Sequence, residues 1–184
     1  TPTPTPTPPV TLSAAGDIGW CGLKGVELTG QLLDSLPGPI LVLGDVAYMD
    51  GSEKDYANCY EPYWGRHRSR TFPVPGNHDY VTASAAPYFA YFGTNAGTPG
   101  LGYYSMRLGA WHLVAVNSNI PVGEGSAQLA WLRQDLAANP AKCTLAYWHH
   151  PRYSSGQNGD SSFVGAALRA LYDAGVEIVL NGHD

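Results

Sequence analysis

Charged residues are scarce in this chain of 184 residues, since Asp, Glu, Lys and Arg together make up only 14% of it. About a quarter is usual for soluble proteins. The formal net charge of −5 at pH 7 offers no basic surface of the kind that binds nucleic-acid phosphates. We therefore expect no nucleic-acid partner. Hydrophobic residues still reach 44%, which is enough for a core and argues against intrinsic disorder.

Long apolar runs are also lacking. None approaches the roughly 20 residues that a membrane-spanning helix needs, so we expect no membrane span. The 22 glycines and 15 prolines indicate a loop-rich protein. The chain is long enough for one domain with a real core and too short for two comfortable ones.

Cysteine is the third scarce residue, with Cys21, Cys59 and Cys143 as its occurrences. They form no Cys-x-x-Cys pair, which argues against a zinc–cysteine site. Cys21 and Cys59 both fall in loops after expected strands, so the sequence is compatible with a disulfide between them and equally with three reduced thiols. Cys143 begins an apolar run and is expected to be a buried strand residue.

Residues 1–9 alternate threonine and proline and form the only repeat in the chain. Alternating proline predicts an extended polyproline II linker, or a stalk. Threonine–proline tracts are typical of O-glycosylated extracellular segments, which favours secretion. Glycan attachment or self-assembly through this tract is therefore expected. The remaining residues, 10–184, are expected to form the folded domain.

From Val10 onward, strand-like and helix-like patterns alternate, which predicts an α/β fold with its site on the loops at strand carboxyl ends. Residues 103–108 and 111–117 are expected to pair as a hairpin, and residues 49–70 to form a long irregular segment. The two prolines of residues 71–75 restrict that strand to an edge or to a very short length. The other expected strands cover 10–15, 40–43, 143–148 and 177–180, and the expected helices cover 25–36, 87–92, 126–138 and 162–172.

Five separated clusters each place a metal-ligand side chain just after an apolar run. In chain order they are Gly16-Asp17-Ile18-Gly19, Gly44-Asp45-Val46-Ala47-Tyr48, Gly76-Asn77-His78-Asp79, His149-His150-Pro151 and Gly182-His183-Asp184. Carboxylate, amide oxygen and imidazole together suit zinc, iron and manganese. A pair of such ions would clamp a phosphate and activate a water molecule. Asp45 can bridge the two because it has two oxygens, and His78 could protonate the leaving group or hold phosphate oxygens.

The clusters resemble the motifs of the calcineurin-like metallophosphoesterase superfamily, and more narrowly those of the secreted purple acid phosphatases. The resemblance runs from about Val10 to Asp184. It implies a β-sandwich flanked by helices and the hydrolysis of small phosphate monoesters at a binuclear metal centre. The residues at positions that match the family's ligands are Asp17, Asp45, Tyr48, Asn77, His149 and His183.

Gly19 and Tyr48 are the residues that resemble the purple acid phosphatases in particular, within the wider superfamily. The wider superfamily has a histidine where this chain has Gly19, whereas the purple phosphatases share the glycine and use the tyrosine as a ligand to ferric iron. The resemblance thus implies iron held by Asp17, Asp45 and Tyr48. It implies zinc, manganese or iron held by Asp45 together with Asn77, His149 and His183.

Two positions depart from the family pattern. The family's last histidine ligand would be residue 185, and its closing strands would follow, so the expected fold is incomplete at its last motif. Asn158 occupies the place of a second substrate histidine. Its amide can hydrogen-bond phosphate but cannot act as an acid near neutral pH.

These departures keep other functions open. One alternative is a phosphatase-like structural subunit of a glycosylated extracellular assembly, with weak or no activity. Another is a fragment of a longer enzyme. Among the remaining histidines, His67 is expected to be solvated and His112 to be structural. The aromatic-rich segment 56–64 is expected to pack over a loop, with a substrate cleft as the alternative.

Overall fold

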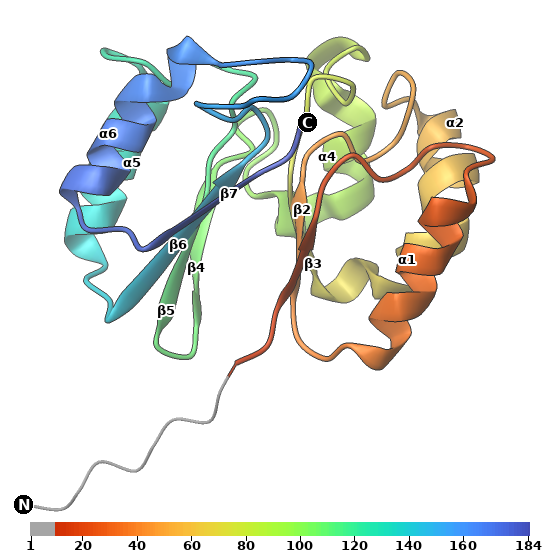
Figure 1. The fold of residues 1–184 in the computed structure, drawn as a ribbon. Helices are drawn as coiled ribbons and strands as arrows, with labels where there is room; N and C mark the ends of the chain where they lie inside the picture. The colour runs from red at the N-terminus through yellow and green to blue at the C-terminus, as the bar shows by residue number, and fades with distance from the viewer. Residues whose placement is uncertain (1–9) are drawn as a thin grey trace, which may run out of the picture.

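The computed structural model describes residues 10–184, and the expectations for the Thr-Pro tract lie outside this range. Two sheets face each other and helices cover their outer faces (Figure 1). The first sheet has the order β1-β2-β3 and the second the order β4-β5-β6-β7. The strands are β1 (Ser13–Ala15), β2 (Ile40–Leu43), β3 (Thr71–Val74), β4 (Tyr104–Leu108), β5 (Trp111–Ala115), β6 (Cys143–Trp148) and β7 (Ile178–Asn181).

Helices α1, α2 and α4 lie beside the first sheet, and α5 and α6 lie against the second (Figure 1). The helices are α1 (Lys24–Ser35), α2 (Glu53–Asp55), α3 (Glu61–Trp64), α4 (Ala86–Phe92), α5 (Ala127–Ala138) and α6 (Gly165–Asp173). Shorter turns are π-helical at Tyr56–Tyr60 and 3₁₀ at Gly65–Arg70, Ala83–Ala85, Gly93–Ala96 and Ser162–Val164. Among the described residues, no helix is both long and apolar enough to cross a membrane.

Strand β2 shows how the core is built, because all four of its residues are buried. Successive side chains of a strand point to opposite faces. Ile40 and Val42 pack toward the helices of the first sheet, while Leu41 and Leu43 pack into the apolar layer between the two sheets. A third apolar layer joins the second sheet to α5 and α6. The arrangement confirms an α/β sandwich of two sheets flanked by helices.

Strands β1, β2 and β3 are parallel to one another, and so are β5, β6 and β7. The carboxyl ends of parallel strands lie at the same edge of a sheet. Every loop that follows one of these strands therefore opens at one end of its sheet, and this is where the candidate ligands lie.

Several local predictions are confirmed. Strands β4 and β5 pair as an antiparallel hairpin, and the proline-containing β3 is an edge strand. Of the two alternatives that the sequence left open for Cys21 and Cys59, the structure has the disulfide. Cys143 begins β6 as expected but is only half-buried.

The prediction of an irregular segment over residues 49–70 was wrong. Ser52 and Asp55 form a capping box, and consecutive helical turns continue from there to Arg70. Within them Tyr56, Tyr60 and Trp64 recur every four residues and are buried in the core beside the first sheet. The aromatic segment therefore packs as expected, and Trp64 at its end also lines a small cavity.

The prediction of a solvated His67 was also wrong. Its side chain is buried, with Nε2 3.3 Å from the carbonyl oxygen of Gly30 and 3.1 Å from Oδ1 of Asp34. Helix α1 covers this histidine, so its surroundings could not be inferred from neighbours in the sequence. His112, expected to be structural, is buried on β5 beside Asp135 of α5.

Two glycines of α1 should respond in opposite directions to alanine. A Cβ on Gly30 would lie 2.6 Å from the carbonyl oxygen of Tyr63, whereas one on Gly25 would meet nothing within 4 Å. Urea denaturation should show Gly30→Ala lowering the free energy of unfolding by about 1–3 kcal/mol, because the helix must move away from its neighbour. Gly25→Ala should raise it by about 0.5–1 kcal/mol, because alanine is the better helix former. Equal stability of the two variants would contradict this packing.

Candidate metal centre

The loops after the parallel strands converge on a pocket of about 500 Å³. Seven of the eight predicted site residues line it, and the eighth, His149, is fully buried beneath. The structure therefore brings the whole predicted set together from positions up to 166 residues apart in the sequence. The lining residues from that set are Asp17, Asp45, Tyr48, Asn77, His78, Asn158 and His183.

Three of these residues have left-handed backbone conformations. The φ angles are 58° for Asp17, 50° for Asp45 and 75° for His183. Each residue comes just after a glycine at the end of a strand. Non-glycine residues in this region typically cost about 1–3 kcal/mol and concentrate at functional sites. The chain therefore accepts local strain where these three side chains enter the pocket.

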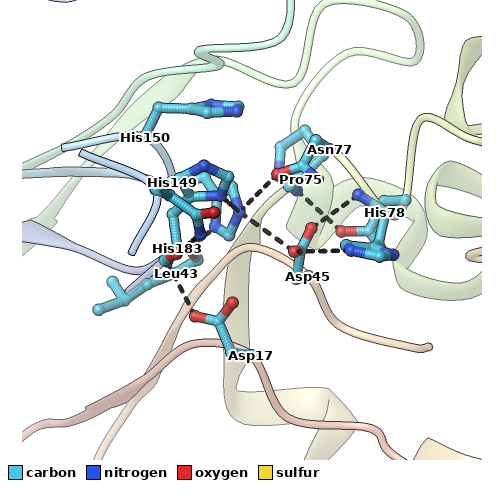
Figure 2. Close-up of polar contacts among 12 residues, drawn as sticks. Asp17, Leu43, Asp45, Pro75, Asn77, His78, His149, His150 and His183 are labelled. Atoms are coloured by element: carbon cyan, nitrogen blue, oxygen red, sulfur yellow. Dashed lines mark hydrogen bonds and ion pairs between the residues drawn. The ribbon is translucent and has the colours of Figure 1, made fainter. Parts of the chain in front are cut away.

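Asp45 lies at the centre of the site (Figure 2). Its Oδ1 accepts a hydrogen bond from the backbone N–H of His78 at 2.8 Å. Its Oδ2 accepts one from the hydroxyl of Tyr48 at 3.0 Å and lies 3.3 Å from Nε2 of His149. A Cβ on Gly76 would overlap the Asp45 carboxylate, so only glycine leaves room for it. One carboxylate thus contacts groups from three different loops.

His149 is held in a defined orientation. Its Nδ1 donates to the carbonyl oxygen of Leu43 at 2.8 Å, which leaves Nε2 facing the site. That nitrogen lies 3.1 Å from Oδ1 of Asn77 and 3.1 Å from Nδ1 of His183. A hydrogen bond from the other ring nitrogen to a carbonyl oxygen is how proteins usually fix the tautomer of a metal-binding histidine.

Tyr48 and Asp17 form the other side of the site. The Tyr48 hydroxyl lies 2.9 Å from Oδ1 of Asp17 and 3.0 Å from Oδ2 of Asp45. The other oxygen of Asp17 accepts the backbone N–H of His183 at 2.9 Å. The phenol has a single proton for two carboxylates, so one of these oxygens is left without a donor from Tyr48.

Two residues proposed to contact substrate lie at the edge of the pocket. Nδ1 of His78 donates to the carbonyl oxygen of Met49 at 2.6 Å, and its Nε2 lies 4.0 Å from Oδ2 of Asp45. The Asn158 side chain donates to the carbonyl oxygen of His183, and its backbone N–H to Oδ1 of Asp184. His78 is therefore oriented with Nε2 toward the site, while the Asn158 amide is occupied by the backbone.

The electrostatics of the site favour ionised Asp45. Burial opposes its charge, but the neighbouring His149 and the His78 N–H lower the pKa of Asp45. Burial likewise opposes a charge on His149, and the Asp45 carboxylate overcomes this and raises the pKa of His149. Burial, followed by the charges of Asp45 and Asp17, raises the pKa of Tyr48. Negative charge is thus concentrated between Asp17 and Asp45.

These residues fit metal ions. Nε2 of His149 lies 3.1 Å from Oδ1 of Asn77, 3.1 Å from Nδ1 of His183 and 3.3 Å from Oδ2 of Asp45, so three potential ligand atoms gather around a nitrogen that has at most one proton to share. Asp17, Asp45 and His149 also offer ligand atoms within 4.8 Å of one another. Carboxylate, amide and imidazole are suitable ligands for divalent first-row metals.

Gly19 shows why this chain carries no histidine two places after Asp17. Its backbone bridges to Ala47, and a Cβ there would overlap the carbonyl oxygen of Val46 and lie 3.1 Å from the Cα of Ala47. A larger side chain would therefore displace the loop that carries Tyr48.

The sequence did not single out Trp20 and Asn181, which also line the pocket. It also gave no role to His150, whose ring centroid lies 4.5 Å from that of His183, or to the buried Asp79. Trp20 directly follows the first cluster, while His150 and Asp79 lie within clusters, and this placement is the signal that could have marked them.

Comparison with known proteins identifies the family of this chain. Residues 14–184 match the family model described as calcineurin-like phosphoesterase, and the chain belongs to this family. Membership implies a centre of two metal ions.

Within that family the chain is similar to purple acid phosphatases. It is 25% identical to purple acid phosphatase 13 of Arabidopsis thaliana over 95% of this chain and 41% of that protein. It is 26% identical to purple acid phosphatase 22 of the same plant over 98% of this chain and 45% of that protein. The chain thus spans less than half the length of these relatives.

Two solved structures share the fold. Purple acid phosphatase PPD1 of yellow lupin (Lupinus luteus) superposes with a TM-score of 0.71 at 14% identity, covering 94% of this chain and 37% of that one. GAP50, described as the anchor in the inner membrane complex of Plasmodium, superposes with a TM-score of 0.69 at 19% identity. That match covers 94% of this chain and 65% of GAP50.

Removing the charge of Asp45 should abolish tight metal binding. Asp45→Asn keeps the shape of the side chain but removes the anionic oxygen that lies between the residues on the Tyr48 side of the site and those on the His149 side. In calorimetric titration with zinc we expect the affinity to fall by more than about 100-fold, because losing a residue that only hydrogen-bonds to a metal ligand already costs about 10- to 100-fold. Asp50→Asn, at an exposed carboxylate five residues further on, is the matched control and should bind as the wild type does. Equal affinities in both variants would refute Asp45 as a shared ligand.

Proposed function

We propose that this protein hydrolyses small phosphate monoesters at a centre of two metal ions. The observation that carries the proposal is the position of Asp45, whose single carboxylate contacts both Tyr48 and His149. Asp17, Tyr48 and Asp45 would hold one ion. Asp45 would share its carboxylate with the second ion, held also by Asn77, His149 and His183. Bound ions of this kind neutralise phosphate charge and lower the pKa of water.

The residues around this centre would handle substrate. His78 is fixed by Met49 with Nε2 toward the pocket, so its protonated form can deliver a proton to the leaving oxygen of an ester. Asn158 lies across the pocket. Its amide can donate a hydrogen bond to a phosphate oxygen once it releases the His183 carbonyl, but it has no proton to transfer.

The donor sets support different metals on the two sides. Two carboxylates and a phenol are hard oxygen donors, which suit ferric iron. The set with Asn77, His149 and His183 adds two imidazoles and suits zinc, manganese or iron. We propose iron on the Tyr48 side and one of these three metals on the other.

We further propose that the protein acts outside the cell. The disulfide between Cys21 and Cys59 supports this location, because such bonds persist in oxidising compartments and are rare in the cytosol. The threonine–proline composition of residues 1–9 points the same way.

A structural role is the second candidate. Strands β1 and β7 are edge strands. A groove of about 480 Å³ lies between residues 10–12, just before β1, and the second sheet, and it is lined mostly by apolar residues, among them Val10, Leu12 and Ile178. Unpaired strand edges and apolar surface both favour association. GAP50, which shares the fold, is described as an anchor. A sample that binds metal but hydrolyses no phosphate ester would favour this role.

The enzymatic proposal is tested by reconstituting the protein, in the form its source expresses, with iron and zinc. We expect hydrolysis of both p-nitrophenyl phosphate and glycerol phosphate. His78→Ala should lower kcat by about 100- to 10,000-fold for glycerol phosphate, because its alkoxide needs a proton to leave. The loss should be much smaller for p-nitrophenyl phosphate, whose leaving group is stable as an anion. Inactivity of the metal-loaded wild-type protein would contradict the phosphatase proposal. Equal losses on the two esters would contradict the role of His78 as proton donor.

Tyr48 should give the iron-loaded protein a visible colour. A phenolate bound to ferric iron absorbs visible light by charge transfer from the ring to the metal. Tyr48→Phe should remove this band in the absorption spectrum, while Tyr153→Phe, at an exposed tyrosine, should keep it. Persistence of the band in Tyr48→Phe would exclude this tyrosine as the iron ligand.

A further inference from the structure

A second, smaller cavity adjoins the candidate metal centre. Its volume is about 210 Å³, and it shares Gly16, Asp17 and Trp20 with the larger pocket. The two hollows therefore lie side by side, with these residues between them. Cavities of about 150 Å³ can hold a benzene ring, so the smaller one has room for a flat ring.

The walls of this cavity are apolar. Beyond Trp20 they include Ile18, Leu23, Val26 and Trp64. Leu23 is 57% exposed, so the cavity opens to solvent on that side.

The polar groups of the cavity wall are already satisfied. The hydroxyl of Thr29 donates to the carbonyl oxygen of Gly25 at 2.8 Å, and Nε1 of Trp64 donates to that of Val26 at 3.2 Å. Apart from Asp17 at the junction, the walls suit a hydrophobic ring better than a polar group.

Trp20 is a rigid wall between the two hollows. Its ring stacks on that of Tyr48, with centroids 4.2 Å apart and an interplanar angle of 20°. The Tyr48 ring in turn lies 4.5 Å from the ring of His78. The next residue, Cys21, is joined to Cys59 by the disulfide. Trp20 is nevertheless 37% exposed, so part of this large aromatic surface is available to a ligand.

We infer that this cavity binds the flat aromatic part of the substrate, with Trp20 as the stacking surface. The phosphate would lie among Asp45, Tyr48 and His78 while the ring enters the hollow beyond Asp17. The substrate class is then a phosphate monoester that carries a planar ring, either an aryl phosphate or a nucleotide. This inference rests on the proposed phosphatase function and adds the group that the site would select.

The test compares the binding of phenylphosphonate and methylphosphonate to the metal-loaded protein by calorimetry, since neither ligand is hydrolysed. We expect phenylphosphonate to bind about 5- to 30-fold more tightly, the range that aromatic stacking supplies. Trp20→Ala should reduce this ratio to near one and Trp20→Phe should keep most of it, while Leu23→Ala, which removes one apolar wall, should lower it in part. Leu32→Ala, 59% exposed on helix α1, which begins directly after Leu23 in the chain, is the matched control for Leu23 and should leave the ratio unchanged.

Using the ratio of two ligands separates the cavity from the metal centre. A change at Tyr48 caused by loss of its stacking partner would weaken both phosphonates alike and leave the ratio unaffected. An equal affinity for the two ligands in the wild type, or a ratio that Trp20→Ala and Leu23→Ala leave intact, would overturn the inference while the phosphatase proposal stands. If neither phosphonate binds, the proposed function fails and the inference falls with it.

Kinetic measurements then distinguish the two substrate classes, nucleotides and aryl phosphates. The values of kcat/KM are compared for phenyl phosphate, adenosine 5′-monophosphate and glycerol phosphate. A loss in Trp20→Ala that is larger for the adenosine ester identifies nucleotides, and a loss that is larger for phenyl phosphate identifies aryl esters. Equal losses for all three substrates would contradict a ring-binding role for Trp20.

Discussion

The rest of the site depends on one constraint: Asp45 must keep a buried, ionised carboxylate where five loops meet. Strand β2, at the centre of its sheet and buried on both faces, delivers this residue. Gly44 and Gly76 leave the space that it and His149 occupy. Donors from separate loops compensate the cost of burying its charge. The Asp45 carboxylate can therefore stay buried and ionised only while these loops keep the positions that form the centre.

Hydrogen bonds made by other candidate ligands join the two sheets. His149 follows β6 of the second sheet and donates to the carbonyl oxygen of Leu43 in the first. His183 follows β7 and gives its backbone N–H to Asp17, after β1. Folding energy and site formation are therefore coupled, because the bonds that close the sandwich at this end are made by the candidate ligands. Metal ions bound only by the folded state would stabilise the whole sandwich.

The sequence predicted the strands and the site well because each candidate ligand directly follows a short apolar run. The carboxyl ends of parallel strands lie at the same edge of a sheet, so ligands that are far apart in the sequence come together in the fold. The helical nature of residues 49–70 was not predicted, although Ser52 and Asp55 form a capping box. Its aromatic residues recur at helical spacing, but their burial depends on packing against α1 and α4, which no local pattern states. Trp20 was missed because its stacking on Tyr48 is formed in three dimensions and has no local pattern either.

The mispredicted segment also supports the loops of the site through a buried carboxylate. Tyr56 donates to Oδ1 of the buried Asp79 at 2.8 Å. The Asp79 carboxylate also accepts the backbone N–H groups of Gly76 and Val46, from the loops after β3 and β2. Burial raises the pKa of Asp79 to about 6, so these donors must work against desolvation to keep it charged. The helical segment therefore fixes the spacing between Asp45 and Asn77 from behind, and the ligand motifs alone do not specify the geometry on which metal binding depends.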